Sequence, residues 1–175
     1  KTYTADELSI TYANNTAAGT ATVTVKGIKN FEGTVEMTFE IKKATLTDAM
    51  LELEYTSTTY TGSALKPSVT LTYNGKTYTA DELSVTYANN TEVGTATVTV
   101  TGVKSFSGTV QLSFTINKAT LTKDMLTLEY TSAIYTGSAL KPSVTLKYNG
   151  VTYSADELKV TYANNTEAGT ATVTI

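Results

Sequence analysis

A five-residue segment recurs in this chain without change, and its spacing limits the folds that the chain can adopt. Tyr-Ala-Asn-Asn-Thr begins at Tyr12, at Tyr87 and at Tyr162, so it recurs every 75 positions (87 − 12 and 162 − 87). The coils of solenoid proteins repeat every 20–47 residues or so, whereas about 75 residues approaches the smallest size of an independently folding domain. The sequence therefore predicts a tandem array of small domains.

The repeat divides the 175 residues into one complete unit and two partial units. Residues 43–117 form the complete unit. Residues 1–42 match its second part, and residues 118–175 match its first part. Each partial unit is expected to have unpaired sheet edges unless another segment completes it. We expect the chain to be a section of a longer protein.

Alternation of polar residues with β-branched and aromatic residues predicts strands throughout the chain. In the complete unit, a short turn of helix is expected at Ala80–Leu83, and Asn74-Gly75 predicts a type I′ hairpin, because both central residues of that turn need positive φ. The predicted strands are Met50–Tyr55, Lys66–Tyr73, Lys76–Tyr78, Ser84–Tyr87, Thr95–Thr101 and Thr109–Ile116.

Comparison of the copies separates inner positions from outer ones. Thr72 is replaced by Lys147 in the next copy, and a position that accepts both residues is expected to face water. Positions that stay apolar in every copy and alternate with polar neighbours predict the core: Leu51, Leu53, Tyr55, Val69, Leu71, Val85, Val98, Val110, Phe114 and Ile116. This pattern predicts an all-β fold of antiparallel sandwiches.

The junctions between units predict a stiff arrangement. The segments Ile41–Leu46 and Ile116–Leu121 contain no glycine, no proline and no serine-rich stretch. Flexible linkers, in contrast, are usually rich in glycine and serine. Successive units are therefore expected to follow one another directly and to form a rod.

Five short blocks occur in order in the complete unit and recur in the partial ones. They are Tyr60–Val69, Tyr73–Lys76, Tyr87–Asn90, Gly94–Val100 and Phe106–Thr109. Their order and spacing resemble the bacterial immunoglobulin-like tandem repeats of long surface and adhesin proteins of Gram-positive, often gut-dwelling, bacteria. The resemblance implies immunoglobulin-like antiparallel β-sandwich domains, which here would recur every 75 positions.

The same resemblance implies a function and a location. The chain would be a non-enzymatic structural stalk or spacer of an extracellular protein on the bacterial cell surface, and it would display a distal functional domain. Its partners would be neighbouring repeats, with the cell wall or a host glycan or protein as further candidates. One alternative is that the repeats themselves bind glycan or host protein. Another is a subunit of an extracellular filament, completed by strand exchange between chains.

Composition excludes several other classes of function. The net charge is −3 and all thirteen cations are lysine, which argues against nucleic acid as a partner. No apolar run approaches the roughly 20 residues of a membrane helix, so no membrane insertion is expected in this segment. Histidine and cysteine are absent, which removes the usual catalytic triads and thiolate chemistry. We expect no enzymatic activity and no cofactor.

Oxygen-bearing side chains before and after the fourth predicted strand suggest a weak calcium site. The candidate ligands are Asp81, Glu82, Asn89 and Asn90. The favoured interpretation is structural: Asp81 starts a short turn by capping backbone amides, and the two asparagines occupy left-handed loop positions. No metal site is therefore expected.

Overall fold

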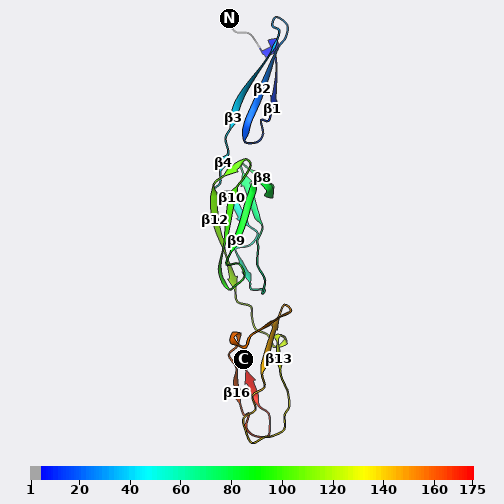
Figure 1. Ribbon diagram of the computed structural model, residues 1–175, viewed down its shortest axis with the longest axis vertical. Coiled ribbons are helices and arrows are strands. Elements are labelled where there is room, and N and C mark those ends of the chain that lie inside the picture. Colours follow the sequence, from blue (N-terminus) through cyan, green and yellow to red (C-terminus); the bar gives the residue numbers. More distant parts are fainter. Residues whose placement is uncertain (1–4) are drawn as a thin grey trace. The chain divides into compact units, whose positions relative to one another are not determined.

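The computed structural model describes residues 5–175 and is all-β (Figure 1). It contains several sheets and almost no helix, which is consistent with a β-sandwich architecture. Helix is confined to single 3₁₀ turns in the described residues, and none of these is long or apolar enough to cross a bilayer.

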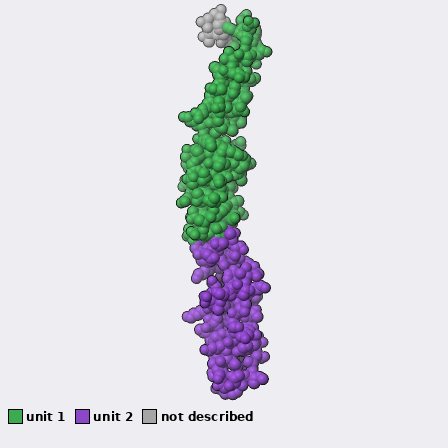
Figure 2. Space-filling model, viewed as in Figure 1, with its two compact units in different colours: residues 1–57, 66–90, 95–115 green, residues 58–65, 91–94, 116–175 purple. Residues whose placement is uncertain are grey.

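The chain forms two compact units, which Figure 2 colours separately. Unit 1 consists of Lys1–Ser57, Lys66–Asn90 and Thr95–Thr115, described from residue 5 onwards. Unit 2 consists of Thr58–Leu65, Thr91–Gly94 and Ile116–Ile175.

Unit 1 begins with the 3₁₀ turn η1 (Ala5–Glu7) and an antiparallel sheet of β1 (Leu8–Ala13), β2 (Gly19–Gly27) and β3 (Thr34–Ile41), with β2 in the middle. Directly paired residues of an antiparallel sheet lie on the same face. On one face the pairs are apolar and exposed large side chains gather: Leu8, Ile10, Tyr12, Val35, Met37 and Phe39. This sheet therefore has an apolar face that no other described sheet covers.

The central residues carry three further sheets. The first is antiparallel and has the order β5-β7-β8, and the second pairs β4 with β11 in parallel. The third has the order β6-β12-β10-β9. The strands are β4 (Ala44–Thr45), β5 (Leu51–Leu53), β6 (Ser57–Thr59), β7 (Val69–Tyr73), β8 (Lys76–Tyr78), β9 (Leu83–Ala88), β10 (Gly94–Gly102), β11 (Phe106–Ser107) and β12 (Thr109–Asn117), with 3₁₀ turns η2 (Asp48–Met50) and η3 (Ala80–Glu82).

Two phenylalanine rings lie at the centre of the core of these sheets. Phe114 is 1% exposed and meets the edge of the Tyr55 ring at 5.7 Å between centroids. Phe106 is also 1% exposed, and its ring meets those of Tyr73 at 5.7 Å and Tyr78 at 5.0 Å. Such edge-to-face pairs stabilise a core by about 0.5–1.5 kcal/mol beyond the burial of area.

The predicted core is confirmed in part. Leu71, Val98, Phe114 and Ile116 are buried, whereas the other six predicted core residues are half-buried. The sequence pattern does not predict Phe106 as a core residue, because no alternating strand pattern surrounds it.

The predicted hairpin and strands are confirmed, with shifted ends. Asn74 and Gly75 have φ of 49° and 74°, and the residues on either side, Tyr73 and Lys76, pair directly. The first two predicted strands are shorter in the structure, and the expected helical turn is η3. The sequence pattern does not predict β4, β6 or β11.

Unit 2 contains an antiparallel sheet of three strands and a separate pair of short strands. The sheet has the order β13-β14-β15, and β16 pairs with β17. The elements are η4 (Lys123–Met125), β13 (Leu126–Leu128), β14 (Val144–Tyr148), β15 (Val151–Tyr153), η5 (Ala155–Glu157), β16 (Thr161–Ala163) and β17 (Thr172–Thr174).

Three substitutions test the assignment of turn, core and surface. Phe114→Ala should lower the free energy of unfolding by about 3–5 kcal/mol, because it removes a buried ring. Gly75→Val should also destabilise, because a β-branched residue at positive φ is strained. Thr72→Lys should change it by less than about 0.5 kcal/mol, since residue 72 is exposed. Urea melts of the full chain would measure all three, and equal damage by Thr72→Lys and Phe114→Ala would contradict the assignment of faces.

Candidate functional site

The proposed calcium ligands lie in two places. Asp81 and Glu82 belong to η3, before β9, whereas Asn89 and Asn90 follow the end of β9. Six strand residues at about 3.3 Å each separate the two pairs by roughly 20 Å. A single cation therefore cannot bind all four residues, and within residues 5–175 no group of three or more acidic side chains is placed to hold a metal ion.

Both carboxylates of the first pair already accept hydrogen bonds from the chain. Asp81 accepts from the Lys104 ammonium and from the Thr79 hydroxyl. Glu82 accepts from the backbone N–H of Ser105 at 2.9 Å. A hydrogen bond to its own backbone N–H is a further contact of the Asp81 carboxylate, and the sequence pattern did not predict the contact to Lys104.

The asparagines of the loop after β9 differ from each other. Asn89 has a φ of 54°, which confirms its predicted left-handed conformation. Asn90 is half-buried and is not among the residues with positive φ, so its predicted left-handed conformation is wrong.

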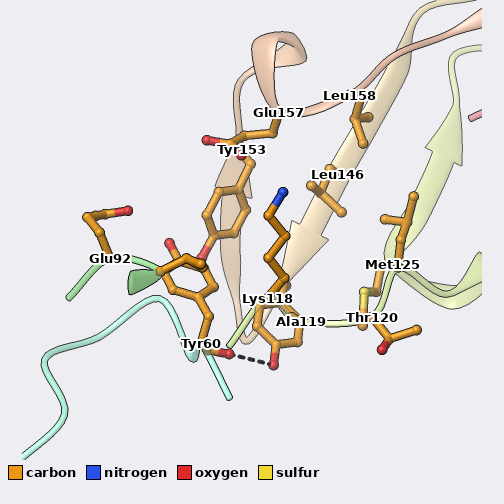
Figure 3. Close-up of a pocket in the computed structure, with 13 residues that line it drawn as sticks. Tyr60, Glu92, Lys118, Ala119, Thr120, Met125, Leu146, Tyr153, Glu157 and Leu158 are labelled. Carbon is orange, nitrogen blue, oxygen red and sulfur yellow. Dashed lines mark hydrogen bonds between the residues drawn. The ribbon is translucent and has the colours of Figure 1, made fainter. Parts of the chain in front are cut away.

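Unit 2 contains a cavity of about 400 Å³ that the sequence pattern does not predict (Figure 3). We call it the Tyr153 cavity. Four of its lining residues are aliphatic or methionine side chains and come from the segment before η4, from η4, from β14 and from the residue after η5: Leu121, Met125, Leu146 and Leu158. Its other lining residues are Tyr60, Glu92, Val93, Lys118, Ala119, Thr120, Tyr148, Tyr153 and Glu157.

Tyr60 contacts the two other tyrosines of the Tyr153 cavity. Tyr60 stacks on Tyr148 with 6.5 Å between ring centroids, and it meets Tyr153 at 6.3 Å with a steep angle between the rings. The Tyr148 hydroxyl donates a hydrogen bond of 3.0 Å to the backbone carbonyl of Tyr60. These contacts fix the Tyr60 ring at one end of the cavity.

The Tyr153 hydroxyl is buried and has no hydrogen-bond partner of normal geometry among the described residues. It lies close to Gly62, whose φ of 78° favours glycine at that position. The pKa of the Tyr60 hydroxyl is raised to about 12. The main cause is its polar interaction with the Tyr153 hydroxyl, and burial of Tyr60 raises this pKa further.

A second cavity of about 370 Å³ also lies within unit 2. We call it the Tyr130 cavity. Its lining combines apolar and aromatic side chains with the polar loop between β16 and β17: Leu128, Tyr130, Leu140, Pro142, Tyr162 and Val173 are among the former, and Asn164, Asn165, Thr166 and Glu167 among the latter. Both cavities present aromatic and aliphatic side chains, against which an apolar or aromatic group can pack.

The repeat provides one indirect signal for these cavities. Residues 118–175 match the first part of the complete unit, so their apolar positions correspond to core positions of that unit.

Comparison of the chain with protein-family models, with curated proteins and with solved structures finds no match.

Calcium should not stabilise the chain, because the candidate ligands are separated. We expect that millimolar calcium and a chelator both leave the melting temperature unchanged, since a ligand raises it only by binding the native state. Differential scanning fluorimetry would measure this. A rise of several degrees with calcium, absent with magnesium, would contradict the expectation.

The contact between Asp81 and Lys104 should be visible in a titration. The Lys104 ammonium, followed by the Thr79 hydroxyl, lowers the pKa of Asp81 below its usual 3.8. The resulting stabilisation is present above about pH 4 and is lost as the pH falls through the lowered pKa. NMR titration of the Asp81 carboxyl should give a pKa below 3.8, and the substitution Lys104→Gln should raise this pKa. An unchanged value in the variant would contradict the assigned cause.

Proposed function

We propose that this chain is a non-enzymatic spacer segment of a long extracellular bacterial surface protein. In this proposal, immunoglobulin-like units that recur every 75 positions follow one another as a rod and hold a distal functional domain away from the cell. Neighbouring repeats are the main partners of each unit.

The main support is that residues 75 positions apart make the same contacts. The Tyr87 hydroxyl donates to the carbonyl of Pro67 at 2.7 Å, and the Tyr162 hydroxyl donates to that of Pro142 at 2.6 Å. In each copy, the proline lies in the loop that precedes a strand of one sheet, and the tyrosine lies on a strand of a different sheet. The contact therefore holds the loop against that second sheet. Repetition of such a structural contact, without a repeated reactive group, is what a spacer requires.

A second pair of contacts follows the same rule. Glu54 accepts hydrogen bonds from the backbone and the hydroxyl of Ser68 at 3.1 and 3.0 Å, and Glu129 accepts from Ser143 at the same distances. These bonds lower the pKa of Glu129, which favours its charged form. Such carboxylates have a structural role as hydrogen-bond acceptors.

The junction near residue 43 supports stiffness. Between the end of β3 and the start of β4 lie two residues, Lys42 and Lys43. The chain is then held at once by main-chain bonds, from the Ala44 N–H to the Ser105 carbonyl at 3.0 Å and from the Leu46 N–H to the Ser107 carbonyl at 2.8 Å. A segment paired on both sides has few conformations available to it.

Small-angle scattering on three complete units in series would test the spacer role. We expect one extended form with a nearly constant rise of about 35–45 Å per unit, because strands of 8–10 residues at about 3.3 Å each span roughly 30 Å before the junction is added. Insertion of four Gly-Ser pairs at the junction is the control and should broaden the distance distribution. A similarly broad distribution without the insertion would contradict the proposal.

A further inference from the structure

Two stretches of the complete copy belong in space with the copy that follows it. Residues 58–65 and 91–94 lie in unit 2, together with residues 116–175. We call residues 58–65 the Tyr60 loop and residues 148–153 the Asn149 hairpin. Both lie within unit 2, so the contacts between them join one copy of the repeated segment to the next inside a single compact unit.

Three hydrogen bonds fix the main chain of the Tyr60 loop. The Tyr148 hydroxyl donates to the Tyr60 carbonyl at 3.0 Å, and the Asn149 side-chain amide donates to the Thr61 carbonyl at 3.1 Å. The Tyr60 N–H donates to the Asn117 carbonyl at 2.8 Å. Two neighbouring donors of the hairpin thus meet two consecutive carbonyls of the loop, and this match holds the hairpin in one register.

Aromatic rings add apolar contact to these bonds. The Tyr60 ring stacks on that of Tyr148, and it meets the Tyr153 ring at a steep angle (Figure 3). Gly62 lies close to the Tyr153 hydroxyl, so the main chain of the loop approaches the hairpin directly. Aromatic pairs of this kind stabilise a contact beyond the burial of their area. The hydrogen bonds therefore orient the hairpin, and the rings hold it against the loop.

Both halves of this contact recur in the sequence. Tyr-Thr-Gly occupies positions 60–62 and 135–137, and Tyr-Asn-Gly occupies positions 73–75 and 148–150. The complete copy therefore carries a loop of the first kind and a hairpin of the second kind. Surfaces arranged in this way allow each copy to contact the next one head to tail.

The loop has the same conformation in both copies. Gly62 and Gly137 have φ of 78° and 75°. In each loop the hydroxyl of the threonine before this glycine donates to the carbonyl of the serine after it, at 3.3 Å in both. The loop therefore folds in the same way in two different surroundings.

The two loops differ in exposure. Tyr60 is half-buried beside the Asn149 hairpin, whereas Tyr135, its counterpart, is 58% exposed. Because the loop conformation is the same, contact with the hairpin accounts for the lower exposure of Tyr60. A binding surface that is formed before its partner arrives loses less entropy on binding.

Asn149 has two separate roles in the hairpin. Its φ of 47° belongs to the turn, and Asn74 in the matching turn has a φ of 49°. Its side-chain amide also bonds to the Tyr60 loop, whereas the Asn74 side chain makes no hydrogen bond within residues 5–175. Glycine adopts positive φ readily but has no amide side chain. A change to glycine at either position therefore separates the turn from the contact.

We propose that the Tyr60 loop is a docking surface and that its partner is the Tyr-Asn-Gly hairpin of the following copy. The contact couples the sheet of β13, β14 and β15 to residues of the preceding copy, so that this sheet opens less often when the loop is in place. In repeat proteins, contacts between nearest neighbours add to the stability of each copy. This docking rests on the proposed spacer function and deepens it, because it identifies the surface through which neighbouring copies join.

Hydrogen exchange of the backbone amides in β14 and β15 of the full chain would test the docking surface. Asn149→Gly should speed this exchange about 3–10-fold, because glycine keeps the turn but loses one hydrogen bond. Asn74→Gly is the matched control, since it makes the same change in the other hairpin and reports the effect of the turn alone through the amides of β7 and β8. Equal effects of the two substitutions, each on its own hairpin, would overturn the proposal.

Replacement of Tyr60 tests the coupling across 88 positions of sequence. Tyr60→Ala should speed exchange in β14 and β15 about 10-fold or more, because it removes two ring contacts, and exchange in β1 and β2 should keep the rates of the parent chain. Tyr135→Ala removes the matching tyrosine of the other loop and should leave β14 and β15 unchanged. Unchanged exchange in Tyr60→Ala, or an equal effect of Tyr135→Ala or on β1 and β2, would overturn the proposal.

Combined substitutions separate one shared contact from two unrelated effects. In Tyr60→Ala with Asn149→Gly, the increase in exchange rate should be smaller than the product of the two single increases, because residues of one contact do not act independently. Tyr135→Ala with Asn149→Gly should give the full product. A full product in both combinations would overturn the proposal.

The exchange rates and the scattering curve test different claims. Coupling that is missing from an array of extended form would overturn the docking surface and leave the spacer function standing. Intact coupling in an array with a broad distribution of distances would overturn the spacer function and leave the docking surface standing.

Discussion

The burial of Phe106 and Phe114 is the interaction on which the central part of the structure depends. Each ring lies where separate sheets meet and contacts tyrosine rings at steep angles. A sheet with one apolar face gains stability only when a second layer covers that face, and a small domain has few side chains with which to do so. Strands far apart in the sequence must therefore come together before either ring is buried.

The sheet of β1, β2 and β3 carries an equivalent residue without that second layer. Phe39 and Phe114 have the same identity and equivalent strand positions, yet their exposed fractions are 44% and 1%. The difference comes from the absence of a covering sheet on β1, β2 and β3 among the described residues, because the strand itself is formed in both places. The covering layer, and not the local sequence, determines which apolar residues become core.

This dependence explains how far the sequence could predict the structure. The hairpin at Asn74-Gly75 and the strand β8 follow from local rules, because turn residues and alternation act over a few positions. The strands β4 and β11 are two residues long and pair in parallel across more than sixty positions, which no local pattern reveals. The cavities escape prediction for the same reason, since their lining residues come from segments far apart in the sequence.

The charged residues have a different and more local part in the structure. Glu54 and Glu129 accept hydrogen bonds from serines fourteen positions later, and Asp81 in η3 pairs with Lys104 in the loop after β10. These groups are exposed, so each interaction contributes little to stability, but each favours one loop geometry. Polar contacts of this kind position the loops, and the apolar faces determine which sheets combine. A protein built in this way can vary its surface from copy to copy while the faces that join its sheets stay the same, which is how Thr72 and Lys147 can occupy corresponding strands.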